Sequence, residues 1–240
     1  INNAVENAFK IIVFTEENKL DLINEYNCKP DDIKILNLTP ILPTKYKNNK
    51  DKNFLEIFNK FTFDKNKQWF FYPSQFWSHK NHIYILNAMR KIDQEKLKKI
   101  GFIFCGRDKG NLDYIKNKIK EYKFEEHIKI LGHIDDNELI SIYKYSDAMI
   151  IPTYLGRSSL PLLEGIYFNK KIYYSKGILD KSLIKYVEEF DLNDPQNLAD
   201  KITKFNNNKI EHNYEKLCSD NFFIETYESI IDEFKLLYSK

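Results

Sequence analysis

Short apolar segments alternate with longer amphipathic segments along most of this sequence, and this order limits the fold more than any other feature. Apolar runs that end at or beside a Gly or Pro occur at 68–73, 101–106, 127–132 and 147–153. Each run is followed by residues whose apolar side chains recur at the spacing of an amphipathic helix. The alternation predicts an α/β fold in which a parallel sheet carries helices on both faces.

The first 45 residues predict a smaller unit that precedes this sheet. An apolar strand is expected at 10–15, and Thr15 at its end can cap the helix that follows. A second strand is expected at 33–40, where a proline stops it. Residues 41–53 are polar and have prolines nearby, which is typical of a linker between domains.

The rest of the chain predicts one large domain followed by a helix. Residues 46–210 contain the alternating segments, and residues 211–240 form an amphipathic helical region. The chain starts with Ile1 instead of Met. We therefore expect it to be a fragment of a longer protein, or to have lost its first residues.

Charge and cysteine content exclude several classes of protein. The 37 Lys and Arg residues nearly balance the 35 Asp and Glu residues, so the net charge of +2 gives no global field that points to nucleic acid. Cys28, Cys105 and Cys218 lie far apart, without the spacing of a zinc site or a disulfide framework, which fits a reducing cytoplasm. No signal peptide is evident, and no apolar run approaches the roughly 20 residues that span a bilayer.

The loops that follow the strands are the expected ligand-binding segments, because parallel sheets bind ligands beyond the carboxyl ends of their strands. In the loop after 68–73, Lys80 lies at a helix start, where a cation is unfavourable unless an anion binds beside it. Gln75 precedes it in the same loop. The alternative is that Lys80 is one exposed lysine among many, and we expect Trp77 to be a packing residue.

Two further loops contribute glycine and polar side chains. Gly106 lets a backbone approach a ligand closely, and Arg107 can bind a phosphate through two hydrogen bonds. His133 follows Gly132, and we expect it to border a ligand without acting as a base. Neither a P-loop pattern nor a GxGxxG pattern occurs, which argues against a nicotinamide oxidoreductase.

The stretch GRSSLPLLEG, residues 156–165, predicts a glycine loop that leads into a helix. Ser158 or Ser159 can cap this helix, Pro161 fits its first turn, and the free amides there can bind an anion. Glu164 is expected in the first turn, facing the same cleft, where its carboxylate can accept both hydroxyls of a ribose. The alternative is that Glu164 is only a favourable acid near the positive end of the helix.

The segments YPSQFWSHKN, FIFCG and IKILGHIDDNELISIYKYSDAMIIPTYLGRSSLPLLEG resemble, in order and spacing, the donor domain of family 4 retaining glycosyltransferases. The resemblance covers roughly residues 10–205 and implies the GT-B fold, in which a nucleotide sugar binds between two Rossmann-like domains. It implies catalytic roles for Lys80, which matches the lysine that holds the donor diphosphate, and for Glu164, which matches the glutamate that holds the ribose. The further donor-binding residues that it implies are Gln75, Arg107, Gly132, His133, Ile134, Gly156, Arg157, Ser158, Ser159 and Leu160.

Two positions depart from the pattern of that family. Gly156 stands where the family usually has the first glutamate of a pair, and Gln75 stands where it usually has an arginine. Arg157 or Arg107 can supply the missing cation. The residue that meets the sugar hydroxyls is therefore left open.

The resemblance implies a metal-independent hexosyltransferase that needs no cofactor and transfers a hexose with retention from a nucleoside-diphosphate sugar, in bacterial envelope polysaccharide synthesis. The acceptor, a glycan or a lipid-linked molecule, would bind an N-terminal domain of which residues 1–45 are a remnant, and the C-terminal helix would return toward that domain. A cytoplasmic location is expected, and the full protein could associate peripherally with the cytoplasmic face of the inner membrane. Two alternatives stay open: a non-catalytic donor-binding or partner module, and a nucleotide-sugar epimerase of the same fold.

Overall fold

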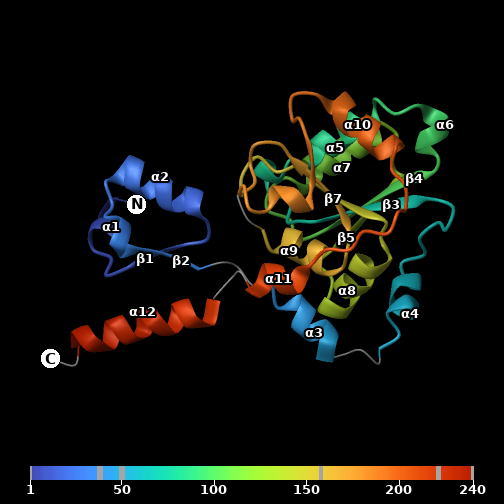
Figure 1. Ribbon diagram of the computed structural model, residues 1–240. Helices are drawn as coiled ribbons and strands as arrows, with labels where there is room; N and C mark the ends of the chain where they lie inside the picture. The colour runs from blue at the N-terminus through green and yellow to red at the C-terminus, as the bar shows by residue number, and fades with distance from the viewer. Residues whose placement is uncertain (1, 37–39, 49–51, 157–158, 220–222, 239–240) are drawn as a thin grey trace.

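The computed structural model describes residues 2–36, 40–48, 52–156, 159–219 and 223–238. Two sheets organise these residues, one of two strands near the N-terminus and one of six strands in the larger unit (Figure 1). Among the described residues, no helix is both long and apolar enough to cross a membrane.

The large sheet is parallel, and its spatial order is β5-β4-β3-β6-β7-β8. The chain therefore forms β3 at the centre and adds β4 and then β5 on one side of it. It then returns to the centre to form β6 on the other side of β3, and adds β7 and β8 beyond β6. Apart from Gln68, the residues of the central strands are buried, because helices cover both faces of the sheet. The strands are β3 (Gln68–Pro73), β4 (Ile100–Cys105), β5 (Ile128–Gly132), β6 (Ala148–Ile151), β7 (Lys171–Ser175) and β8 (Glu188–Phe190).

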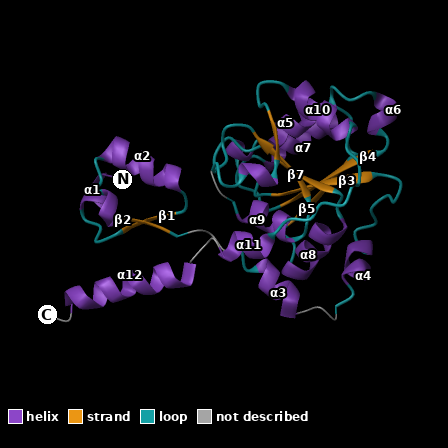
Figure 2. Ribbon diagram, viewed as in Figure 1, coloured by secondary structure: helices purple, strands orange, loops and turns teal. Residues whose placement is uncertain are grey.

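Helices form a layer on each face of this sheet (Figure 2). One layer contains α5 (His82–Met89), α7 (Leu112–Glu121) and α10 (Pro195–Thr203). The other contains α3 (Leu42–Asn48), α4 (Phe54–Asn59), α8 (Asp136–Tyr145) and α9 (Leu160–Tyr167). The short helix α6 (Gln94–Leu97) precedes β4. The prediction of an α/β fold with a parallel sheet and helices on both faces is confirmed.

Local sequence signals fix where several of these helices begin. Asp135 caps α8, and its backbone amide donates a hydrogen bond to the Glu138 side chain, so a capping box is present. Asp194 caps α10, where proline occupies the first turn. Both caps place an acid at the positive end of a helix, where its charge is favourable.

The smaller unit pairs β1 (Ile11–Val13) with β2 (Ile33–Ile35) in parallel, and α2 (Glu16–Tyr26) connects them. Thr15 caps α2, as expected. The helix α12 (Phe223–Tyr238) lies beside this unit in Figure 1, and Glu233 pairs with both Lys10 and Lys34. The short helix α1 (Asn2–Glu6) precedes β1.

The structure differs from the expected linker at 41–53. Residues 42–48 form α3, which packs beside α8 and α9 and buries Leu42 in the core of the larger unit. The C-terminal region at 211–240 contains two helices, and the first of them, α11 (Tyr214–Ser219), buries Leu217 in the same core. The second helix, α12, lies against the smaller unit, where Glu233 pairs with Lys10 and Lys34.

Candidate functional site

The centre of the large sheet contains a switch point between β3 and β6. These strands are neighbours, yet the loop after β3 leads to α5 on one face and the loop after β6 leads to α9 on the other (Figure 1). Doubly wound sheets bind ligands at this position, beyond the carboxyl ends of the two strands. Of the expected site residues, Gln75 and Lys80 lie in the first loop, Gly156 and Ser159 lie in the second, and Leu160 and Glu164 lie in α9.

The loop after β3 is held by hydrogen bonds to its backbone around Lys80. The buried Tyr72 hydroxyl donates to the carbonyl oxygen of Lys80 at 2.8 Å. The carbonyl oxygen of His79 accepts from the Tyr154 amide at 2.9 Å, which ties the loop to the one after β6. Burial lowers the pKa of the Lys80 amine. A cation in this partly desolvated position gains stability from an anion bound beside it.

Gln75 and Trp77 lie at the outer side of the same loop. The Trp77 indole donates to the Gln75 side chain at 3.0 Å, and its ring stacks with the His79 ring at 6.1 Å between centroids. The Trp77 side chain is 43% exposed, and Lys109 lies over its ring. The expectation that Trp77 packs in the protein is therefore wrong, because its ring projects at the surface of the loop.

The loop after β4 is joined to its neighbours through Gly106. The Gly106 amide donates to the carbonyl oxygen of Gly132 at 2.7 Å, and the Phe76 amide donates to the carbonyl oxygen of Arg107 at 3.0 Å. The ends of β3, β4 and β5 are thereby connected by backbone hydrogen bonds. The Arg107 side chain is exposed, and so is that of His133, while Ile134 is half-buried.

The loop after β6 ends in the expected helix start. The Gly156 carbonyl oxygen accepts from the Tyr174 hydroxyl at 2.9 Å, and the backbone at Gly156 has a φ of 114°. Ser159 is the residue that caps α9, since its side chain accepts from the Leu162 amide, and Pro161 lies in the first turn. Leu160 is 41% exposed at this end of the helix. Arg157 and Ser158 lie outside the described residues.

Glu164 lies one turn deeper in α9 than expected, because α9 begins at Leu160 and its first turn contains no acid. Its carboxylate oxygen Oε2 accepts from the Tyr143 hydroxyl of α8 at 2.7 Å. Burial raises the pKa of Glu164 from 4.5 to about 7. Because Glu164 lies beyond the first turn and its half-buried carboxyl is costly to ionise, the alternative of a simple first-turn acid is wrong.

Tyr143 is the residue near this site that sequence reasoning missed. It lies in the second half of α8, and nothing in the sequence separates it from the other 15 of the 16 tyrosines. Its contact with Glu164 depends on how α8 and α9 pack against each other. Residue patterns within one helix do not report that packing.

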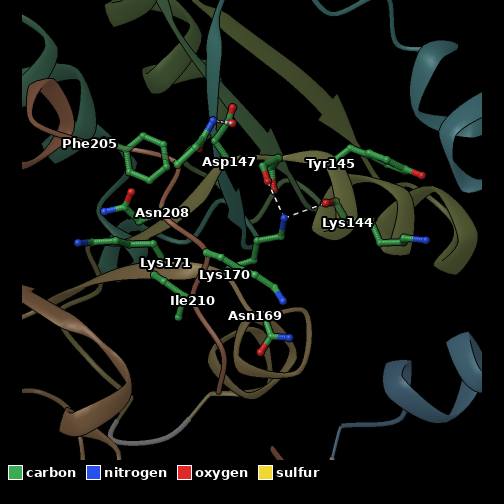
Figure 3. A pocket seen from close by; sticks show the side chains of 12 residues that line it. Lys144, Tyr145, Asp147, Asn169, Lys170, Lys171, Phe205, Asn208 and Ile210 are labelled. Atoms are coloured by element: carbon green, nitrogen blue, oxygen red, sulfur yellow. Dashed lines mark hydrogen bonds between the residues drawn. The ribbon is translucent and has the colours of Figure 1, made fainter. Parts of the chain in front are cut away.

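Figure 3 shows a pocket with a volume of about 360 Å³ at the end of the strands opposite the candidate site. It lies at the amino ends of β6 and β7, beside Asp147 and Lys170. The Lys170 amine donates to the carbonyl oxygens of Lys144 at 2.8 Å and Ser146 at 2.7 Å, so it satisfies the end of α8 (Figure 3). Burial lowers the pKa of Lys170 to about 8. Its contacts explain this lysine as a structural residue.

Among the described residues, no group of three or more His, Cys, Asp or Glu side chains gathers as in a metal site. The residues at the switch point are instead a lysine, a carboxylate, backbone amides and hydroxyl groups. These groups suit a ligand that has both negative charge and hydroxyl donors.

Solved structures with a similar fold include a glycosyltransferase, a protein bound to UDP-glucose and a synthase. A glycosyltransferase from Rickettsia africae superposes with a TM-score of 0.75 at 19% identity, over 96% of this chain and 64% of that one. HepE from Anabaena in complex with UDP-glucose gives 0.69 at 16%, over 98% and 66%. Sucrose-phosphate synthase from Thermosynechococcus elongatus gives 0.70 at 14%, over 99% and 60%. The chain thus spans less than two thirds of the length of each of these proteins.

In a comparison with curated protein sequences, none matches the chain. The family described as glycosyl transferases group 1 matches residues 53–220, which is more than half of the chain and includes the whole large sheet. Its match contains both loops at the switch point and the paired Tyr143 and Glu164. The chain therefore belongs to the glycosyl transferases group 1 family.

Proposed function

We propose that this chain is the donor-binding part of a retaining glycosyltransferase of family 4. It would bind a nucleoside-diphosphate sugar and transfer its hexose to a glycan or a lipid-linked acceptor. One observation carries the proposal: the partly desolvated amine of Lys80 and the half-buried carboxylate of Glu164 follow the two strands that meet at the switch point. The similar structures of HepE hold UDP and UDP-glucose, so uridine nucleotides are the first donors to test.

Lys80 would bind the diphosphate of this donor. A phosphate would compensate the desolvation that lowers the pKa of the amine. The amides at the start of α9, next to Ser159 and Leu160, would contribute further donors, because a helix start attracts anions. Arg107 or Arg157 would supply the additional cation that Gln75 cannot.

Glu164 would bind the ribose of the donor. Two vicinal hydroxyl groups can donate hydrogen bonds to one carboxylate. A diphosphate could not take this place, because its negative charge would repel the carboxylate. The segment from Gly132 to Ile134 would form a wall of the nucleobase pocket, with His133 as a contact. The backbone link between Gly106 and Gly132 connects that wall to the centre of the site.

The reaction that we propose requires stabilisation of the departing nucleoside diphosphate. Lys80 and the amides of α9 would neutralise the charge that develops on the leaving oxygen. We propose that no metal ion or cofactor is needed, since no Asp-x-Asp pair occurs in the sequence. The sugar phosphate itself would take the proton of the acceptor hydroxyl.

We place the acceptor site in the part of similar structures that this chain does not span. The proposed process is bacterial envelope polysaccharide synthesis on the cytoplasmic side, with the full protein associated peripherally with the membrane. Two alternatives compete with transfer. A non-catalytic module would bind the donor without releasing a nucleoside diphosphate, and an epimerase would return an altered nucleotide sugar.

The test is a thermal-shift panel of UDP, GDP, ADP, CMP, TDP and NAD with the wild type, Glu164→Ala and Lys80→Gln. A ligand at ~100 times its dissociation constant should add about 2.7 kcal/mol to the free energy of unfolding. We expect one nucleoside diphosphate to stabilise the wild type and neither variant. Glu121→Ala, at an exposed position of α7, is the matched control and should respond like the wild type. Stabilisation by NAD alone, or by no nucleotide, would contradict the proposal.

A further inference from the structure

The hydrogen bond between Tyr143 and Glu164 connects two helices beneath the candidate site. Tyr143 is fully buried in α8, and its hydroxyl donates to Oε2 of Glu164 in α9 at 2.7 Å. A carboxylate has two oxygen atoms and several lone pairs, so this single bond leaves Glu164 able to accept from other donors. The bond therefore restrains the carboxylate without using up its capacity.

The Tyr143 ring is held by aromatic neighbours on two sides. It stacks on Phe168 with 5.3 Å between ring centroids and an interplanar angle of 12°. Phe71 of β3 meets it edge to face at 5.2 Å and 81°. Because the ring contacts both the central strand and the end of α9, the hydroxyl oxygen is held in one position. A donor held in place restrains the acceptor to which it donates.

The surroundings of Glu164 disfavour its charged form. Burial is the main cause of its raised pKa, and the negative charge of Asp136 at the start of α8 raises it further. The Cys105 thiol at the end of β4 also faces this carboxyl, and its own pKa is raised by burial and by Glu164. Tyr143 acts in the opposite direction, because its hydrogen bond stabilises the carboxylate.

We propose that Tyr143 is a positioning residue for donor binding: it holds Glu164 ionised and oriented so that the carboxylate accepts the ribose hydroxyls. This inference rests on the proposed function, in which Glu164 binds the ribose. Tyr143 itself does not contact the donor. Its consequence is selectivity for a ribonucleotide over the corresponding 2′-deoxyribonucleotide, because the deoxy sugar lacks one of the two donors.

The test measures dissociation constants by calorimetry for UDP and GDP and for their 2′-deoxy counterparts. Tyr143→Phe removes only the hydroxyl and keeps the ring contacts. For the ribonucleotide that binds, we expect the variant to bind about tenfold more weakly, with a much smaller change for the deoxy form. The pH at which affinity falls to half its maximum should move upward, because the bond that lowers the pKa of Glu164 is lost.

Tyr173→Phe is the matched control. Tyr173 is also buried, and its hydroxyl donates to a backbone carbonyl, that of Lys201, at 3.3 Å on the other side of the sheet. The Tyr173→Phe variant should leave the affinities for the ribonucleotide and the deoxyribonucleotide, and their pH profile, unchanged. Tyr143→Phe should also have no further effect on affinity in a Glu164→Gln background, where the proposed route of action is already absent.

Three results are decisive against the inference. Unchanged affinity and pH profile in Tyr143→Phe would leave Tyr143 with a packing role alone. An equal loss for ribo- and deoxyribonucleotide would show that it does not act through the ribose. If the wild type bound no nucleoside diphosphate, the proposed function itself would fail, and that outcome is distinguishable because it needs no variant.

Discussion

The carbonyl oxygen of Ser74 lies 2.3 Å from the position that a Cβ atom on Gly106 would occupy. The Gln75 amide nitrogen lies 2.7 Å from the same point, and Gly106 has a φ of 152°. These neighbours are backbone atoms, which cannot rotate away as a flexible side chain can. Only glycine therefore allows the loops after β3 and β4 to touch at the edge of the candidate site.

Gly106→Ala should disturb both stability and donor binding. We expect a loss of about 3 kcal/mol in the free energy of unfolding and a weaker response to nucleoside diphosphates, because the segment with Gln75 must move. Urea unfolding and calorimetry measure the two effects. Gly110→Ala is the control: its φ is 92°, but a Cβ there meets nothing within 4 Å. It should cost about 1–2 kcal/mol and leave binding intact. Equal effects of the two variants would contradict the role of close contact.

Gly165→Ala should destabilise the protein through the packing of α9 on the sheet. A Cβ at this position would lie 2.5 Å from Sδ of Met149 in β6 and 3.0 Å from Cδ1 of Ile172 in β7. Overpacking of this kind costs about 1–3 kcal/mol. The measurement is the urea midpoint, and Met149→Ala should destabilise the Gly165→Ala variant less than it destabilises the wild type, because it makes space for the added Cβ. A neutral Gly165→Ala would show that α9 shifts without cost.

Glu164→Gln should stabilise the folded protein at pH 8 but much less at pH 5. The folded-state pKa of about 7 lies above the ordinary value of 4.5, so the folded state holds the proton more tightly. The resulting stabilisation is complete below pH 4.5 and is lost as the pH rises through 7. At pH 8 the charged carboxyl is therefore a liability of about 3 kcal/mol relative to the unfolded chain. Urea titrations of both proteins at the two pH values test this. A difference that does not change with pH would contradict it.

His82 should make the protein sensitive to acid. It is fully buried, its ring lies 4.4 Å from that of Phe76 and 4.7 Å from that of Tyr72 between centroids, and burial lowers its pKa from 6.5 to about 3. Because the unfolded chain takes up the proton first, this contribution to stability is full above pH 6.5 and declines toward pH 3. By pH 4.5 it should have declined by about 2–3 kcal/mol.

His82→Phe should remove this decline. The measured quantity is the difference in free energy of unfolding between wild type and variant as the pH falls from 7 to 4.5, which separates His82 from the opposite effect of Glu164. His133→Gln, at an exposed position, is the control and should leave the pH dependence unchanged. A parallel decline in wild type and His82→Phe would mean that His82 is not the acid-sensitive group.

The sequence was most informative where local chemistry decides the structure. Phe70 and Phe71 belong to a run of apolar residues that is buried because both faces of the sheet are covered, and this made the parallel sheet predictable. Ser159 and Asp135 mark helix starts by hydrogen bonds within a few residues. At both helix starts the atoms that interact are close in the chain.

Features that depend on distant contacts could not be predicted in this way. Leu42 lies in a polar stretch, and its burial comes from α8 and α9. The strand β8 is short and contains two glutamates, and its pairing with β7 holds it in place. The depth of Glu164 follows from where α9 begins, and its partner Tyr143 follows from how two helices pack.

The ion pairs of Glu233 with Lys10 and Lys34 have a topological consequence. The smaller unit is assembled from two stretches of chain, and the larger unit is an insertion between them. The polypeptide therefore crosses between the units twice. A single proteolytic cut at either crossing would leave the two units covalently joined through the other crossing.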